Sequence, residues 1–322
     1  MASIRDALRP VLKALKIFFF TIQILFYFMI TPIFFLLLAP FVTARRAIRW
    51  NFSYLTWCMR ARPHFMGPID QKQVQEFRGV VFTTHKGWFD FCINNYFGLP
   101  ASLSRLMVAI CCPAAFLLAT LSGNFLVFRR SSPTPKKGSA SPAASPAPNG
   151  GHPLGVRICD YLAKRNPRLL VFPEGHRNHE RGLLPLRTGI FRICFQFQIP
   201  VLLAPAEGSQ YIIDESRYLL DRSGRPYVVN FARIVHPKDF PTWEAFHQSC
   251  TLTFTAAYQE AVERYDAIRA STKRGLARSC SPTPVPAPVP APADAPAASV
   301  ATPPAASSPC PAPFTCSSSK SD

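Results

Sequence analysis

The first sixteen residues have the pattern of a basic amphipathic helix. Apolar side chains recur at helical spacing and basic ones fill the other side: Ile4, Leu8, Val11, Leu12 and Leu15 against Arg5, Arg9, Lys13 and Lys16. The run that follows, residues 17–42, contains no charged residue. As one helix it would be about 39 Å long, against a hydrocarbon core of ~30 Å. These patterns predict an N-terminal membrane-embedded helical segment whose start lies on an anionic lipid surface.

Two arrangements of this apolar run are open. Pro32 removes a helix hydrogen bond near its middle, so the run is either one tilted span or a kinked hairpin within one leaflet. Basic residues flank both ends, which gives no orientation by the positive-inside rule and favours the hairpin. A cleaved signal peptide, with its shorter apolar region, and a buried soluble helix are the alternatives that we weigh less.

Farther along the chain, strand-like and helix-like patterns alternate. Short β-branched or apolar runs predict strands at 79–84, 124–128, 168–172, 199–206 and 227–235. Amphipathic runs predict helices at 51–62, 154–164, 191–196 and 243–272, and the interrupted apolar stretch 103–121 predicts a core or interfacial helix pair. We therefore expect an α/β fold, with a mixed sheet flanked by helices.

Composition divides the chain into three parts. Many of the 33 Pro fall in residues 131–153 and 280–322, where Pro, Ala and Ser dominate and large apolar side chains are scarce. We expect residues 1–50 to be the amphipathic start and membrane anchor. Residues 51–279 would be a folded domain with a low-complexity insertion at 131–153, and residues 280–322 a disordered tail.

The net charge and the cysteine pattern limit the kinds of partner and ligand that the chain is expected to bind. The chain has 36 Lys and Arg against 18 Asp and Glu, a net charge of +18. No zinc finger, RNA-binding aromatic signature or basic zipper accompanies this charge, so we expect a membrane and a phosphorylated substrate rather than nucleic acid. None of the ten Cys has C-x-x-C spacing, and the His residues lack metal-like spacing. We expect buried thiols, no metal and no cofactor.

Two short motifs follow predicted strands and could carry chemistry. His85 and Asp90 form an H-x4-D pair after strand 79–84. A neutral imidazole can accept a proton from a hydroxyl while a carboxylate orients its other nitrogen. Phe172-Pro173-Glu174-Gly175-His176-Arg177 follows strand 168–172, where Arg177 offers a fork suited to phosphate and Glu174 can anchor the turn or orient a substrate hydroxyl. Taken alone, each motif also has a simpler explanation. The first could be a surface His with a helix-capping Asp, and the second a β-turn with a solvated Arg.

In this order and at this separation, the motifs resemble those of the glycerolipid acyltransferase family, which includes the 1-acylglycerol-3-phosphate (lysophosphatidic acid) acyltransferases. The family's four blocks are matched by 84–90, 123–129, 172–177 and 199–205. This sequence departs from the usual pattern of the family at several positions. Thr84 replaces the usual Asn, His176 the usual Thr and Asn178 a frequent Ser. Phe128 replaces an acidic or polar residue, and Arg187 lies where a Lys is usual nearby.

The resemblance implies a glycerol-phosphate acyltransferase-like fold over 51–279 and direct acyl transfer. His85, held by Asp90, would deprotonate the free hydroxyl of lysophosphatidic acid, which attacks the thioester of acyl-CoA to give phosphatidic acid. The substrate-binding residues would be Arg129 and Arg177, helped by Lys86 and Arg187, together with Glu174 and Gly175. Acyl-CoA is then a co-substrate, the lysophospholipid is the acceptor, and no separate cofactor is needed.

Other readings remain open at this point. The acceptor could instead be glycerol-3-phosphate or a headgroup-bearing lysophospholipid such as lysocardiolipin. From a different class, the chain could be a non-catalytic membrane scaffold or a hydrolase of similar layout. We expect the membrane to be the endoplasmic reticulum, with the mitochondrial membrane as the second option because the basic start also resembles a transit peptide.

Overall fold

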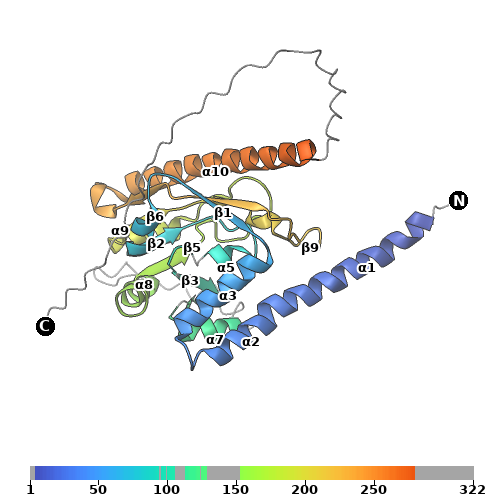
Figure 1. Cartoon of the computed structure of the whole chain (residues 1–322). Coiled ribbons are helices and arrows are strands. Elements are labelled where there is room, and N and C mark those ends of the chain that lie inside the picture. The colour runs from blue at the N-terminus through green and yellow to red at the C-terminus, as the bar shows by residue number, and fades with distance from the viewer. Residues whose placement is uncertain are drawn as a thin grey trace, which may run out of the picture. The chain divides into compact units, whose positions relative to one another are not determined.

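The computed structural model describes residues 4–93, 96–98, 100–105, 113–123, 125–128 and 153–279 (Figure 1). Apart from Pro153, the expected insertion 131–153 lies outside these residues, and so does the expected tail 280–322. Contacts within the chain divide it into Met1–Leu276 and Ala277–Asp322. The elements below belong to the first unit, except for the last turn of the C-terminal helix.

The N-terminal run is helical from Ile4 to Leu38. It consists of α1 (Ile4–Leu25), a wider π turn η1 (Phe26–Ile30) and α2 (Thr31–Leu38). The π turn ends two residues before Pro32, which lacks the N–H that a regular helix would use. Among the described residues, one helical run, Leu8–Leu38, is long and apolar enough to cross a membrane.

The chain turns after α2 and continues in α3 (Ala44–Cys58), which Thr43 caps by accepting a hydrogen bond from the Arg46 N–H at 3.2 Å. Helices α2, α3 and α7 (Pro113–Leu121) share one apolar cluster, which includes Phe35, Ile48 and Leu118. Helix α3 begins seven residues before the predicted helix 51–62 and runs across residue 50. The division of the chain at that residue stays a prediction.

The main sheet has six strands in the order β11-β6-β2-β5-β3-β4. Their bounds are β2 Gly79–Phe82, β3 Ala101–Arg105, β4 Phe125–Phe128, β5 Arg168–Val171, β6 Val201–Leu203 and β11 Arg233–Val235. All neighbours are parallel except β11 and β6, which are antiparallel. The expected mixed sheet is confirmed.

Side chains alternate between the two faces of this sheet, and each face is covered by helices. Val81, Leu170 and Leu202 share a cluster with Leu55 of α3 and with Val74 of α4 (Gln71–Glu76). The neighbouring residues of the same strands pack on the opposite face against α8 (Pro153–Lys164), α9 (Thr188–Gln196) and α10 (Trp243–Ser279). Figure 1 shows α10 on one side of the sheet, and α3 and α7 on the other.

A second sheet has the order β1-β10-β7, formed by β1 (Arg62–Met66), β10 (Pro226–Asn230) and β7 (Ala206–Glu207). Strand β10 is parallel to β1 and antiparallel to β7. A two-stranded ladder, β8 (Ile213–Asp214) and β9 (Leu219–Leu220), lies between β7 and β10 in the sequence. The turn η2 (Ser209–Tyr211) precedes β8.

Three of the predicted elements were wrong in part. The single strands expected at 199–206 and 227–235 are each two strands, because the chain passes from one sheet to the other at Pro205 and at Phe231. Pro205 has no N–H with which to continue the ladder. The helix pair expected at 103–121 is also wrong at its start, since β3 occupies 101–105. There the place of this segment between β5 and β4 in the sheet decides the conformation, and Pro113 begins α7 rather than breaking a helix.

Strands β2 and β5 bring both sequence motifs to one edge of the sheet. They pair in parallel, with Phe82 opposite Val171. The carboxyl ends of parallel neighbours lie at the same edge, so His85 and Glu174 leave the sheet side by side.

Candidate active site

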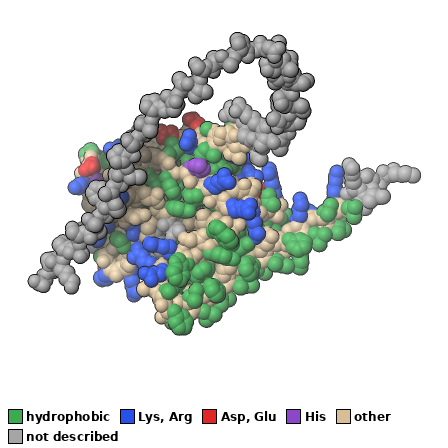
Figure 2. All heavy atoms as spheres, viewed as in Figure 1, with side chains coloured by type: hydrophobic (Ala, Val, Ile, Leu, Met, Phe, Trp, Pro, Cys, Tyr) green, Lys and Arg blue, Asp and Glu red, His purple; other side chains and the backbone are tan. Residues whose placement is uncertain are grey.

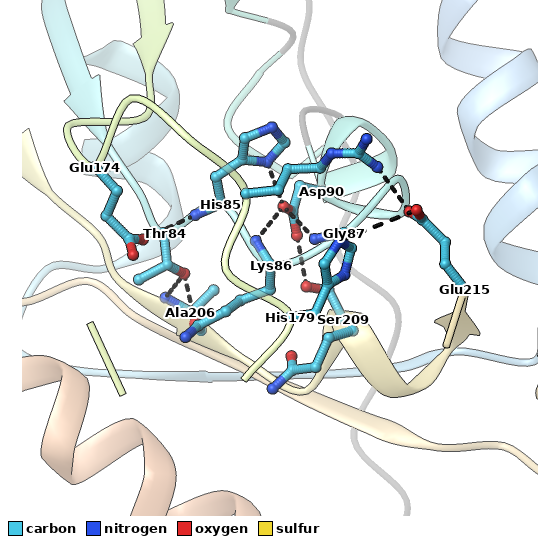
Figure 3. A network of polar contacts seen from close by, with 12 residues as sticks. Thr84, His85, Lys86, Gly87, Asp90, Glu174, His179, Ala206, Ser209 and Glu215 are labelled. Atoms are coloured by element: carbon cyan, nitrogen blue, oxygen red, sulfur yellow. Dashed lines mark hydrogen bonds and ion pairs between the residues drawn. The ribbon is translucent and has the colours of Figure 1, made fainter. Parts of the chain in front are cut away.

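The loop after β2 folds His85 and Asp90 against each other. His85 Nδ1 lies 2.8 Å from Asp90 Oδ2 (Figure 3). Asp90 begins the short helix α5 (Asp90–Ile93), so its carboxylate can reach back across the loop despite the five-residue spacing. The backbone N–H groups of Lys86 and Gly87 donate to the same oxygen at 2.6 and 2.9 Å.

The second oxygen of Asp90 accepts a hydrogen bond from the Ser209 hydroxyl. Asp90 is buried, and four donors therefore surround its carboxylate, which offsets the cost of removing that charge from water. Ser209 lies in η2, directly after Gly208 with its left-handed backbone (φ 109°). The turn that follows β7 of the second sheet thus supplies one side of the His85–Asp90 pair.

The His85 ring is fixed on a second side by Phe172. The two rings are stacked with centroids 4.0 Å apart and planes 13° apart. With Nδ1 held by Asp90, Nε2 is the ring nitrogen left for other chemistry, and among the described residues nothing is bonded to it. The side chain is 16% exposed. This arrangement suits a proton acceptor that faces an incoming hydroxyl.

Glu174 joins the two motifs. Its carboxylate is 1% exposed and accepts from the His85 N–H at 3.1 Å and from the Leu184 N–H at 2.9 Å. Burial raises the pKa of Glu174, while these two N–H groups, Lys86 and His85 act in the opposite direction. Of the two roles considered for Glu174, the geometry matches the anchoring of the turn.

Gly175 shapes the turn after β5. Its φ is +71°, and its N–H donates to the Phe172 carbonyl at 3.0 Å. A Cβ at this position would lie 3.2 Å from Arg187 Cγ, so the Arg187 side chain passes close over the glycine. Arg187 is exposed, and its own N–H donates to the Pro173 carbonyl at 2.7 Å.

Lys86 lies beneath the pair rather than in the exposed part of the site. It is 0% exposed, and its amine donates to the carbonyls of Glu180, at 3.1 Å, and Gly182. The amine also lies 4.9 Å from the centroid of the Tyr258 ring. Burial lowers the pKa of Lys86, and the carboxylates of Glu207, Glu174 and Asp90 oppose that shift. The structure therefore does not bring Lys86 to a place where a phosphate could reach it.

Tyr258 and Glu207 complete a buried network behind Lys86. The Tyr258 hydroxyl donates to Glu207 Oε2 at 2.7 Å and accepts from the Gly182 N–H at 3.1 Å. Gln210 Nε2 donates to the other oxygen of Glu207 at 2.6 Å. Together these bonds fasten the loop around Gly182 to α10 and to the second sheet.

Arg177 lies at the exposed edge of the site. Its guanidinium is 4.8 Å from the centroid of the Trp88 ring, and one of its nitrogens donates to Glu215 Oε1 at 2.6 Å. Trp88 also contacts Phe28 of η1, with ring centroids 5.8 Å apart. The apolar N-terminal run therefore lies one side chain away from Arg177, through Phe28 and Trp88.

The structure brings together six of the eight residues predicted for the site: His85, Asp90, Glu174, Gly175, Arg177 and Arg187. Lys86 is close but buried behind them. Arg129 lies outside the described residues, although β4 ends at Phe128 on the same edge of the sheet. No group of His, Cys, Asp and Glu in the described part of the chain could hold a metal ion.

Sequence reasoning missed Ser209, Glu207, Glu215 and Tyr258. All four lie more than 80 residues from the first motif, and none has a local pattern that marks it. One signal was present, because a strand predicted at 199–206 implies that the residues after it reach the same edge of the sheet.

Comparisons with known proteins agree with this geometry. A family model described as Acyltransferase matches residues 69–203, which include both motifs. The chain is 25% identical over 154 residues to the 1-acyl-sn-glycerol-3-phosphate acyltransferase of Haemophilus influenzae, covering 47% of this chain and 56% of that protein. It is 26% identical over 163 residues to the human 1-acyl-sn-glycerol-3-phosphate acyltransferase beta, covering 47% and 51%. The chain thus spans about half the length of these relatives.

A solved structure shows the same fold. The 1-acyl-sn-glycerophosphate (LPA) acyltransferase PlsC from Thermotoga maritima aligns with a TM-score of 0.53 and 17% identity. The alignment covers 78% of this chain and 97% of that one.

Proposed function

Because the chain belongs to the glycerolipid acyltransferase family, we propose that it is a membrane-bound enzyme that transfers a fatty acyl group from acyl-CoA to lysophosphatidic acid, forming phosphatidic acid. The observation that carries the proposal is the His85–Asp90 contact, with Nε2 left for a substrate and Arg177 at the exposed edge. A non-catalytic scaffold would not need this pair.

In the proposed reaction His85 is the general base. Its Nδ1–H is held by Asp90, so Nε2 accepts the proton of the acceptor hydroxyl as the hydroxyl oxygen attacks the thioester carbonyl. The tetrahedral intermediate collapses by breaking the C–S bond, and the imidazolium returns the proton to the departing CoA sulfur. Asp90 stabilises the imidazolium between the two steps. No covalent acyl-enzyme is required.

We propose that Arg177 and Arg187, with Arg129, bind the phosphate of the acceptor. Arg177 uses one nitrogen for Glu215 and its face for Trp88, which leaves further N–H donors for a phosphate oxygen. Lys86 is left out of this set because its amine is bonded to carbonyl groups. We propose that Gly175 shapes the turn and does not bind substrate through its N–H, because this N–H already donates to the Phe172 carbonyl.

The membrane part of the proposal rests on the N-terminal run. The long apolar helix exposes large hydrophobic side chains along its length, among them Phe18, Phe19, Ile33, Phe34 and Leu37. Through Phe28 and Trp88 this run reaches the edge of the site, so lipid substrates could enter laterally from the bilayer. We propose the endoplasmic reticulum as the membrane.

The test is acyl-CoA-dependent acylation by membranes that contain the chain or its His85→Ala variant at matched expression. His236→Ala is the control, because this histidine directly follows β11 and belongs to neither motif. We expect activity on lysophosphatidic acid that His85→Ala abolishes and His236→Ala retains. Activity only on glycerol-3-phosphate or lysocardiolipin would keep the mechanism and change the acceptor. Equal rates with wild type and His85→Ala on every acceptor would contradict the proposal.

A further inference from the structure

A second group of basic side chains lies at the opposite edge of the main sheet, where β2 and β5 begin. Arg168, the first residue of β5, is 7% exposed. Its guanidinium donates to the Gly98 carbonyl at 2.9 Å and to the Gln75 carbonyl. Arg45 of α3 donates to the same Gly98 carbonyl at 3.3 Å. Two guanidinium groups therefore converge on one oxygen atom.

Two more arginines adjoin this pair. Arg49 lies one helical turn after Arg45 on α3, and Arg78 directly precedes Gly79, which pairs with Arg168 across the sheet. We call Arg45, Arg49, Arg78 and Arg168 the arginine cluster. Burial lowers the pKa of Arg168, and the charges of Arg45, Arg78 and Arg49 lower it further.

No negative charge balances the arginine cluster within the part of the chain that the structure describes. None of its four members forms an ion pair there, although other surface arginines, such as Arg177 and Arg181, do. Nε of Arg168 is buried and has no hydrogen-bond partner. Like charges gathered in this way repel one another, and a bound anion would relieve that repulsion.

The arginine cluster adjoins a surface suited to lipid. Helix α3, which carries Arg45 and Arg49, also exposes Trp50 and Trp57, and α7 beside it exposes Leu117 and Leu121. Figure 2 shows Lys and Arg side chains gathered beside a broad hydrophobic surface in the lower part of the view. Tryptophan next to arginine at the border of an apolar surface is typical of the headgroup level of a membrane.

We propose that the arginine cluster binds the phosphate group of an anionic membrane lipid, at a site separate from the acyl-transfer site. Strands of four residues, about 13 Å long, separate the two edges of the sheet, so one headgroup does not reach both sites. This inference does not depend on the proposed function. It assigns an anionic lipid as the partner of the positive charge of α3.

The test measures binding of dihexanoyl phosphatidylglycerol to the full chain in a non-ionic detergent by isothermal titration calorimetry. Dihexanoyl phosphatidylcholine is the neutral comparison and inorganic phosphate the lipid-free one. The test variants are Arg45→Gln/Arg49→Gln and, separately, Arg78→Gln, all at exposed positions that leave buried Arg168 in place. The control Arg264→Gln/Arg269→Gln makes the same change in charge on α10, across the sheet.

We expect the wild type to prefer phosphatidylglycerol to phosphatidylcholine, and affinity to fall about fivefold for each arginine of the cluster removed, so about 25-fold in the double variant. The α10 control and Arg177→Gln should bind as the wild type does. Equal binding of the two lipids, or unchanged affinity in the double variant, would overturn the proposal. Loss of binding in Arg177→Gln alone would place the lipid in the acyl-transfer site instead. Displacement of phosphatidylglycerol by an equal concentration of inorganic phosphate would overturn the assignment to a lipid.

Discussion

The Ser209 hydroxyl donates to Asp90 across a separation of 119 residues in the sequence. The bond connects the small second sheet with the carboxylate that orients His85. We therefore expect Ser209 to be a positioning residue, which would act on the substrate only through Asp90 and His85.

Ser209→Ala should lower kcat about tenfold, the effect of about 1.4 kcal/mol in the transition state, because one donor to a buried carboxylate is lost. The KM for the acceptor should stay within about twofold, since Ser209 does not touch the proposed phosphate site. Steady-state kinetics on the detergent-solubilised full chain checks both numbers. Ser271→Ala on α10, where the hydroxyl bonds only within its own helix, is the matched control. A rise in KM with unchanged kcat would show that Ser209 acts on binding.

Glu174 makes a pH-dependent contribution to stability. Burial raises its pKa, so the folded state binds this proton more tightly than the unfolded state does. The free energy of unfolding should therefore gain a contribution as the pH falls through the raised pKa toward the ordinary value near 4.3. Glu174→Gln removes the titration, and its amide cannot accept from both His85 and Leu184, so the variant should be less stable by about 1–3 kcal/mol.

Thermal unfolding of wild type and Glu174→Gln across this pH range measures the effect. The difference between them should widen as the pH falls. Glu180→Gln, an exposed carboxylate in the neighbouring loop, should show no such change. A difference that is constant with pH would mean that Glu174 keeps its charge throughout.

Replacing Lys86 with Met tests whether this amine holds a loop or a substrate. Lys86→Met keeps an apolar side chain of similar length but leaves the carbonyls of Glu180 and Gly182 without their donor. We expect faster hydrogen exchange in residues 178–184 and a KM for the acceptor that changes less than twofold. Lys164→Met, at an exposed ion pair on α8, is the control. An increase in KM of tenfold or more, with hydrogen exchange unaltered, would show that Lys86 binds the acceptor phosphate.

In the proposed phosphate site, Glu215 would compete with the acceptor phosphate for Arg177. Both side chains of this ion pair are partly exposed, so their interaction is worth no more than about 1 kcal/mol. Glu215→Gln should therefore lower the KM for lysophosphatidic acid about two- to fivefold, whereas Arg177→Gln should raise it. Asp266→Asn, which removes the carboxylate from another exposed arginine pair, should leave KM unchanged. The KM values are measured by steady-state kinetics with lysophosphatidic acid at a fixed concentration of acyl-CoA. An unchanged KM in both Arg177→Gln and Glu215→Gln would show that Arg177 does not bind the phosphate.

The sequence could predict much of the main sheet because its central strands are local patterns. Runs such as Val80-Val81-Phe82 are buried on both faces and read as strands without tertiary context. The first and third blocks lie directly after such strands, so their meeting at one edge followed from parallel pairing. The order of the six strands is set by contacts far apart in the sequence and could not be derived in this way.

Other features depended on tertiary context. Strand β3 lies in a stretch whose composition suits a helix, and only its place between β5 and β4 makes it a strand. The burial of Lys86 could not be predicted either, because the sequence around a lysine next to His85 does not show whether its amine faces solvent or Tyr258. Ser209 and Glu215 complete the site from loops with no spacing signal.

The crossing of the chain at Pro205 affects how the protein loses activity on heating. Beyond this proline the backbone leaves the six-stranded sheet, and within a few residues it supplies Ser209 to the His85–Asp90 pair. The second sheet is small, and its strand β7 has only two residues. Partial opening of that sheet would withdraw Ser209, one of the four donors to Asp90, while the apolar cluster on the α10 side of the main sheet stays packed. On heating, activity should then fall before the helical signal does.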